Sequence, residues 1–306
     1  MRGSSDAAGE AGPPWVGLLH LSVLYTVWST TYLAIRVAVR PGGFPPFLMS
    51  GGRLLAAGLL VGLVALVLRR PLAVSRRDLA VIVSAGLLLW IGGNGAVTWA
   101  EQYADSGYAA LLIGALPIWV AVIEALVDRR PPTRRLLAAL LLGFAGVAVL
   151  TLPRLMVAEG ADALAVLALL AAPISWGGGT VLQARLRPQA APLVSAALQQ
   201  LAGGLAFLAI AWALGEQMPA DPAADAWWAW GYLVVFGGLA FISFVEAVRR
   251  LPTRVVMTYA YVNPVGAALL GWWLLDEPIG ASTILGAGLV IAGVAGVFRE
   301  RYGRAI

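Results

Sequence analysis

Two stretches of the sequence decide the fold: LLIGALPIWVAVIEALVDRRPP, which is Leu111–Pro132, and AYVNPVGAALLGWWLLDEPI, which is Ala260–Ile279. Each is a long apolar run that one proline interrupts, and in each a second proline follows 14 residues after the first. The matched prolines, 147 residues apart, are Pro117 with Pro264 and Pro131 with Pro278. Similarity at a fixed separation of about half the chain predicts an internal repeat.

The composition places the chain in a membrane. Its 306 residues are 60% hydrophobic and only 12% charged. A soluble domain carries roughly 45–50% apolar and about 25% charged residues. The alternative, a large soluble helical protein, needs polar helix faces that are missing here. We therefore predict an all-α integral membrane protein in contact with the lipid bilayer.

A helix needs about 20 apolar residues to cross the hydrocarbon. Apolar runs of this length, separated by charged or Pro/Gly-rich breaks, predict ten transmembrane helices. The expected helices are residues 16–38, 47–68, 79–100, 106–127, 134–152, 162–184, 192–214, 227–248, 255–275 and 280–298. Their short connections make consecutive helices antiparallel.

Arginine supplies all 21 basic residues, and its positions predict an orientation. If the N-terminus is cytoplasmic, 17 arginines fall on the cytoplasmic side of the ten helices and three on the other side. Arg53 lies inside a predicted helix. Because basic residues concentrate in cytoplasmic loops, both termini are expected to face the cytoplasm. The pI of about 10.0 is therefore interpreted as a topology signal and not as nucleic-acid binding.

The repeat extends beyond the prolines, because the tetrapeptide AGVA at Ala145–Ala148 recurs at Ala292–Ala295. Five helices per half is an odd number, so the second half starts on the opposite side of the membrane. We therefore expect two inverted five-helix repeats, the plan of secondary transporters with a solute site between the repeats. The predicted organisation is a disordered cytoplasmic tail at 1–14, a first repeat at 15–153 and a second repeat at 154–306.

Several weak motifs occur in a specific order. They are Trp28-Ser29-Thr30-Thr31-Tyr32, Arg53 early in the second helix, the proline-containing fourth and ninth helices, Asp276-Glu277-Pro278, and the glycine-rich GAGLVIAGVAGVF. In this order, over about residues 15–300, they resemble the drug/metabolite transporter superfamily, in its ten-helix branch of bacterial amino-acid and metabolite exporters. One departure is Arg129-Arg130-Pro131, which lacks the acidic residue in the first half. The resemblance implies export of small amphipathic solutes, amino acids among them, across the bacterial inner membrane.

The interrupted helices indicate where the solute binds, since such helices in corresponding places of two repeats mark the site. Pro117 and Pro264 each remove a backbone donor. The exposed carbonyl is tolerated where it faces protein or a wet cavity, although a plain packing kink is the alternative. The expected substrate-binding residues are Trp28, Trp90, Asn94, Thr98, Gly114, Pro117, Trp176, Ser243, Tyr259, Tyr261, Asn263 and Pro264.

Trp90, Asn94 and Thr98 recur every four residues and therefore share one helix face. Asn94 is costly to leave unpaired, and its alternative role is to hold helices together. With Trp28 and Trp176, Trp90 lies deep enough to stack on a solute ring or attract an ammonium group. Simple packing is the alternative for each of the three.

The charged residues within the predicted helices leave alternatives open. Arg53 braces loops or reaches outward, or it receives a carboxylate of the solute. Glu124 and Glu246 lie close to helix ends and are interpreted as interfacial, and His20 as a packing residue. Since deep carboxylates are scarce, proton-coupled and facilitated transport both stay open. The oligomeric state is open too, and the sequence is compatible with a monomer.

We predict an alternating-access carrier that exports amino acids, including aromatic or other apolar ones, or related metabolites. The alternatives are a drug or nucleotide-sugar carrier of the same superfamily, or a passive facilitator or channel. An intramembrane enzyme would need a nucleophile with its base, or metal ligands, at membrane depth. With one histidine and no cysteine, the chain is expected to have no catalytic residue, metal site or cofactor.

Overall fold

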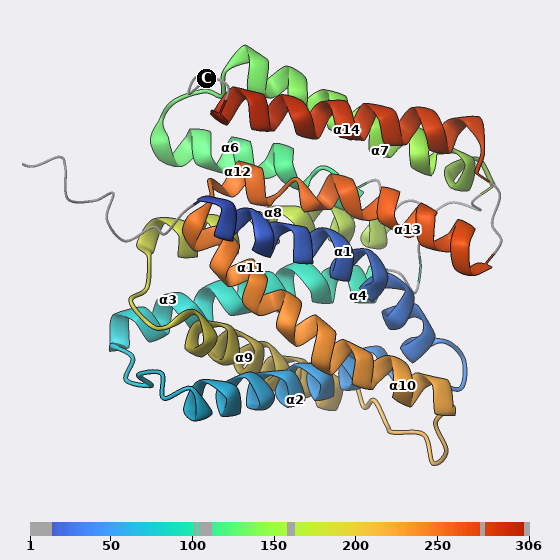
Figure 1. The fold of residues 1–306 in the computed structure, drawn as a ribbon. Helices are drawn as coiled ribbons and strands as arrows, with labels where there is room; N and C mark the ends of the chain where they lie inside the picture. The colour runs from blue at the N-terminus through green and yellow to red at the C-terminus, as the bar shows by residue number, and fades with distance from the viewer. Residues whose placement is uncertain (1–13, 101–102, 104–111, 158–162, 276–278, 303–306) are drawn as a thin grey trace, which may run out of the picture.

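The computed structural model describes residues 14–100, 103, 112–157, 163–275 and 279–302. Within these residues every regular element is a helix, and Figure 1 shows long helices that lie roughly along one common direction. The elements are α1 Pro14–Val39, α2 Pro46–Val67, α3 Arg76–Leu87, η2 Leu88–Gly95, α4 Ala96–Ala100, α6 Leu116–Asp128, α7 Arg134–Val157, α8 Ala163–Leu186, α9 Pro192–Ala213, α10 Ala224–Tyr232, η3 Leu233–Gly237, α11 Gly238–Arg250, α12 Thr253–Val256, α13 Tyr259–Leu275 and α14 Ala281–Tyr302.

Eight helical segments in the described ranges are long and apolar enough to cross a membrane. They are Trp15–Val39, Pro46–Val67, Arg76–Ala100, Arg134–Leu152, Ala163–Leu186, Pro192–Ala213, Ala224–Arg250 and Ala281–Arg301. The all-α integral membrane class is thereby confirmed, whereas ten spanning helices remain a prediction. Of the other two expected helices, 106–127 is represented by α6 with 13 residues and 255–275 by α13 with 17. Residues 106–111 lie outside the described ranges, as do the expected tail at 1–13 and the motif Asp276-Glu277-Pro278.

Local sequence signals set several helix starts. Pro46 and Pro192 open α2 and α9, where the missing proline N–H would have had no partner in the helix. The Ser75 hydroxyl accepts a hydrogen bond from the Asp78 backbone N–H, at 3.0 Å, and caps α3. At the start of α2 the Glu216 carboxylate, from the turn after α9, accepts two backbone N–H groups at 2.7 and 3.2 Å. Glu216 thus joins the two halves of the chain.

Two of the spans change locally from α- to π-helix, which the hydropathy pattern does not predict. The π-helical segments η2 and η3 begin at Leu88 and Leu233, 145 residues apart. A wider π turn disturbs the ordinary backbone bonding, and such segments are frequent at functional sites. The Ser175 hydroxyl of α8 donates to the Leu88 carbonyl at 2.8 Å. Gly92 permits this approach, because a Cβ there would collide with that hydroxyl.

The prolines that define the repeat have different local roles. The interruption expected near Pro117 occurs as a turn at Gly114 and Ala115, and Pro117 stands in the first turn of α6. A proline there removes no intrahelical hydrogen bond, so Pro117 starts a helix and does not kink one. Pro264 lies inside α13 as expected. Helix α7 continues to Val157, past its expected end at 152.

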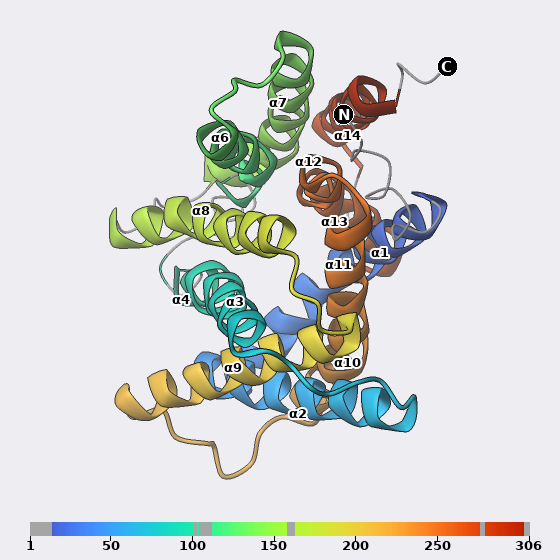
Figure 2. The same cartoon turned by 90° about the vertical axis from the view of Figure 1, so that its left-hand side faces the viewer.

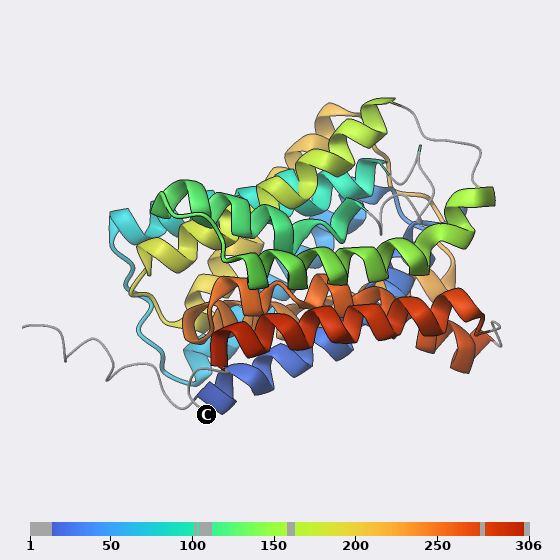
Figure 3. The ribbon, with the colours of Figure 1, turned by 90° about the horizontal axis from the view of Figure 1, so that it is seen from above.

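Helices far apart in the sequence lie side by side. Figure 2 has α7 and α14 at one side of the bundle and α2 and α9 at the opposite side. Between these pairs, α8 packs against α3, η2 and α4, whereas α1 packs against α11 and α13. Seen from above in Figure 3, α7 and α14 run along most of the length of the molecule. A buried apolar core joins the two flanks.

The chain turns collect at two ends of the bundle (Figure 1). We call the end with the turns at 68–75, 129–133 and 187–191 the arginine-rich end, and the end with the turns at 40–45 and 214–223 the far end. At the arginine-rich end, Arg185 of α8 lies 2.6 Å from the Asp128 carboxylate and 3.8 Å from that of Glu124. Arg254 of α12 lies 3.6 Å from the same Glu124. These ion pairs connect α6 to helices of the second half.

Candidate functional site

A cavity of about 100 Å³ lies among helices of both halves. Its walls are mainly apolar with a few polar groups, as is common in sites for small molecules. Its walls come from α1, α2, η2, α4, α8, η3, α13 and the segment around the start of α6. The lining residues are Trp28, Thr31, Ile35, Arg53, Trp90, Gly93, Asn94, Val97, Ile113, Leu116, Ala172, Pro173, Trp176, Gly237 and Tyr259.

A group of touching rings, which we call the aromatic layer, forms the base of the cavity. Its members are Trp28, Trp90, Trp176, Phe241, Phe244 and Tyr259. Trp176 is central: its ring centroid lies 5.7 Å from that of Trp28 and 5.9 Å from that of Trp90, both edge to face. Trp28 also meets Tyr259 edge to face at 4.6 Å. Edge-to-face pairs are favourable, so these contacts hold the indole rings in defined orientations.

The cavity lies between the aromatic layer and the far end. Ile35 follows Trp28 by about two turns of α1, toward the far end. Val97 is displaced in the same way from Trp90, and Pro173 precedes Trp176 in the antiparallel helix α8. All three line the cavity on its far-end side.

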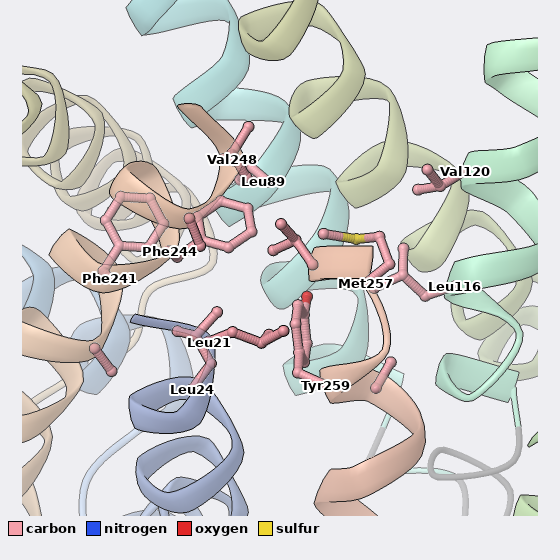
Figure 4. Close-up of a cluster of buried hydrophobic side chains, with 14 of the residues drawn as sticks. Leu21, Leu24, Leu89, Leu116, Val120, Phe241, Phe244, Val248, Met257 and Tyr259 are labelled. Carbon is pink, nitrogen blue, oxygen red and sulfur yellow. The ribbon is translucent and has the colours of Figure 1, made fainter. Parts of the chain in front are cut away.

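On its other side the aromatic layer is backed by packed apolar side chains. Leu21, Leu24, Val248 and Met257 are each at most 5% exposed. Figure 4 shows them around Phe244 and Tyr259, contributed by α1, α11 and the segment between α12 and α13. The ion pairs of Arg185 lie beyond this packing, at the helix ends. The cavity is therefore closed toward the arginine-rich end.

Arg53 is the charged group of the cavity wall. It is 6% exposed, and its Nη2 donates to the Asn94 side-chain oxygen at 3.0 Å. Its guanidinium also lies 5.7 Å from the centre of the Trp90 ring. The alternative in which Arg53 reaches outward is therefore wrong. No carboxylate of the described residues lies within 4.0 Å of it.

The structure brings five of the twelve predicted site residues together around the cavity: Trp28, Trp90, Asn94, Trp176 and Tyr259. The other seven are not among the lining residues: Thr98, Gly114, Pro117, Ser243, Tyr261, Asn263 and Pro264. Gly114 and Pro117 are sequence neighbours of the lining residues Ile113 and Leu116. Pro264 lies five residues beyond Tyr259 on α13.

Tyr261 connects helices at a distance from the cavity. It is fully buried, and its hydroxyl donates to the Leu140 carbonyl of α7 at 2.7 Å. Its ring covers Gly143, where a Cβ would come within 2.6 Å of the ring. The hydroxyl and part of the ring are thus both engaged by α7, and a direct role of Tyr261 in binding a solute stays a prediction.

The remaining polar residues bond to neighbouring helices or to their own. Ser243 Oγ lies 3.2 Å from His20 Nδ1, and Asn263 Oδ1 accepts from Ser29 at 3.5 Å, so both connect α1 to the second half. The Thr98 hydroxyl donates to the Asn94 backbone carbonyl at 2.9 Å, within its own helix. A direct role for these residues in binding a solute stays a prediction.

Several lining residues were not expected from the sequence. Thr31 and Ile35 continue the helix face of Trp28, and Val97 lies one turn after Gly93 on α4. A search for the residues three, four and seven positions from each deep tryptophan would have found all three. Pro173, an interior proline of α8, was a second available signal.

Comparison with known proteins gives consistent results. The profile of the EamA-like transporter family matches residues 15–152 and again residues 163–299. The chain is 32% identical over 285 residues to the "Uncharacterized inner membrane transporter YedA" of Escherichia coli K12, covering 92% of this chain and 90% of that protein. It is 26% identical to the "Uncharacterized transporter YoaV" of Bacillus subtilis, covering 90% and 94%. A solved crystal structure superposes with a TM-score of 0.77 at 22% identity, over 93% of this chain and 98% of the other.

Proposed function

Because the chain belongs to the EamA-like transporter family of the drug/metabolite transporter superfamily, we propose that it is an alternating-access carrier that exports amino acids or related small metabolites. That it is a membrane transporter follows from the family and from the eight long apolar helices among the described residues. One observation supports the carrier mechanism above the others: a cavity lined from both halves lies on one side of the aromatic layer, and packed apolar side chains lie on the other.

The helix contacts support two inverted five-helix repeats. If the expected helices are numbered 1 to 10, α2 with α9 pairs helix 2 with helix 7, and α7 with α14 pairs helix 5 with helix 10. Helix 3 (α3, η2 and α4) packs on helix 6 (α8), and in the same way helix 8 (α10, η3 and α11) packs on helix 1 (α1). Exchanging the two halves leaves this pattern unchanged. The double match of the family profile and the equivalent positions of η2 and η3 agree with it, and we propose 15–153 and 154–306 as the halves.

The arginine distribution supports an orientation in the membrane. We propose that the arginine-rich end and both termini are cytoplasmic, in a bacterial inner membrane. The cavity then opens away from the cytoplasm, as expected for a carrier in its outward-facing state. In the inward-facing state the ion pairs of Glu124 and the packing behind the aromatic layer separate, and the far end closes.

The cavity walls match an amphipathic solute. The indole rings of Trp28, Trp90 and Trp176 offer flat apolar surfaces to an aromatic or aliphatic side chain, whereas Arg53 and Asn94 offer polar contacts. Few directional contacts predict modest affinity and broad selectivity. Aromatic and other apolar amino acids have this combination of groups.

A counterflow screen of the 20 standard amino acids in proteoliposomes tests the proposal. We expect saturable counterflow of apolar and aromatic amino acids, reduced in Trp176→Ala and Asn94→Ala variants that express normally. Trp228→Ala is the matched control, because Trp228 is 82% exposed on the outer surface. Non-saturating flux with ion-like conductance would favour a channel. Absence of counterflow for every amino acid would refute the proposed solute class.

A further inference from the structure

We propose that Arg53, Trp90 and Trp176 form a receptor for a carboxylate, so that the carrier accepts carboxylic acids and zwitterions and rejects the same molecules without the acid group. The inference rests on the proposed function and specifies which chemical group of the solute the cavity recognises. It follows from three buried N–H groups on residues that line the cavity.

Each of the three residues has a buried N–H group without a hydrogen-bond partner among the described residues. These groups are Arg53 Nε, Trp90 Nε1 and Trp176 Nε1. Buried polar groups in folded proteins are nearly always paired, because an unpaired donor has lost its water without compensation. Three unpaired donors on the residues around one cavity therefore indicate a missing acceptor. An acceptor that arrives with the solute satisfies all three.

The other polar groups of the wall add few acceptors. Asn94 uses its side-chain oxygen to accept from Arg53, so its NH₂ group remains as a donor. The Thr31 hydroxyl donates its proton to the Trp28 carbonyl at 2.9 Å. No Asp or Glu is among the described residues that line the cavity. A wall with one positive charge and an excess of donors favours an anionic group that only accepts.

A carboxylate fits this wall better than a cation or a phosphate does. The planar guanidinium presents its donors as a fork that matches the two oxygens of a carboxylate. Since Nη2 of Arg53 is held by Asn94, Nε remains available on the same planar group. A cationic solute would bring a like charge next to Arg53. A phosphate dianion would keep one negative charge uncompensated, because Arg53 is the charged residue of the described lining.

The receptor also spans the two halves of the chain. Arg53 and Trp90 belong to the first half and Trp176 to the second, and the two tryptophan rings are 5.9 Å apart. A carboxylate bound by all three contacts both halves at once. The apolar part of the solute is then directed toward Trp28 and Tyr259, which lie together at 4.6 Å.

Matched ligand series on the wild-type protein give the first test. One series is L-phenylalanine, 3-phenylpropionate, phenethylamine and L-phenylalaninamide, and the other is L-leucine, 4-methylpentanoate, isoamylamine and L-leucinamide. Binding is measured as ligand-induced thermal stabilisation of the purified protein, and transport as competition with counterflow. We expect the acids to bind about 10- to 100-fold more tightly than the amines and amides, the effect of one charge-assisted hydrogen-bonded contact.

Equal binding of an amine or amide and its parent acid would overturn the receptor, and so would the failure of all four acids to bind. Acids that bind in detergent without any counterflow would support the receptor but refute the carrier function. Phenethyl phosphate is the additional probe for phosphate. If it binds more tightly than both carboxylate series, the receptor is not for a carboxylate.

Variants give the second test. Arg53→Gln keeps N–H donors but removes the charge, and we expect it to lose the preference for acids over amides. Trp176→Phe keeps an aromatic ring but removes one N–H, and a smaller loss of the same preference is expected. Arg299→Gln is the control, since Arg299 is an exposed arginine at the end of α14. A monodisperse Arg53→Gln protein with the wild-type ratio of acid to amide affinity would contradict the proposal. If that variant does not fold, the same affinity ratio measured for Arg53→Lys and the ligand series on the wild-type protein still test the proposal.

Discussion

The contact between Trp28 and Trp176 provides a quantitative test of the aromatic layer. Their ring centroids lie 5.7 Å apart at 81°, and the two residues come from the two segments that the family profile matches. Trp176 contacts three rings of the layer, those of Trp28, Trp90 and Phe244. At about 0.5–1.5 kcal/mol for each aromatic pair, Trp176→Leu is expected to lower the free energy of unfolding by about 1.5–4.5 kcal/mol.

A double-mutant cycle isolates the single contact between the halves. We predict a coupling energy of about 0.5–1.5 kcal/mol between Trp28→Leu and Trp176→Leu, because leucine keeps an apolar side chain but removes the ring. The free energies come from reversible unfolding in SDS, followed by circular dichroism. Trp28→Leu combined with Trp228→Leu is the control cycle and should be additive within about 0.3–0.5 kcal/mol. If the Trp28–Trp176 cycle is equally additive, the edge-to-face contact does not exist in the folded protein.

Three further predictions use other contacts. Tyr261→Phe removes the bond to the Leu140 carbonyl, and it should lower the free energy of unfolding in the SDS titration by about 1 kcal/mol while counterflow persists. Glu216→Ala removes the cap of α2, and a loss of about 0.5–2 kcal/mol is expected in the same titration, smaller for Glu216→Gln. Because the chain has no cysteine, single cysteines report access: a membrane-impermeant maleimide added outside right-side-out vesicles should label Ile35→Cys and spare Leu21→Cys. Equal labelling of both would contradict a cavity that is closed on the arginine-rich side of the aromatic layer.

The apolar runs predicted most of the helices, because a segment that crosses a bilayer must have a certain length and hydropathy. The span expected at 79–100 is observed at Arg76–Ala100, and the one at 192–214 at Pro192–Ala213. Hydropathy does not report the hydrogen-bonding pattern of a helix. The π-helical segments η2 and η3 therefore had no sequence signal, although the glycines of η2 allow the close contact with Ser175.

Residues of the site were predictable where their type has few structural roles deep in a membrane. The deep tryptophans Trp28, Trp90 and Trp176 were expected at a cavity, and all three line it. Ser243 and Tyr261 looked equally suitable, but their partners decide their placement. His20 lies 223 residues from Ser243, and Leu140 lies 121 residues from Tyr261. No local sequence pattern reveals which distant group will form a hydrogen bond with a given hydroxyl.

The buried guanidinium of Arg53 has a consequence for the response of the carrier to voltage. A membrane potential falls mainly across the part of the path without water, which here is the aromatic layer and the side chains packed behind it. Arg53 lies on the far-end side of that barrier. In the proposed cycle, the water-free barrier lies on the far-end side of Arg53 when the cavity opens to the cytoplasm. The charge of Arg53 therefore experiences a different part of the membrane potential in each state, although the side chain itself stays in place. One elementary charge across 100 mV corresponds to about 2.3 kcal/mol. In the proposed cycle, the potential of a living cell therefore biases which face of the empty carrier opens.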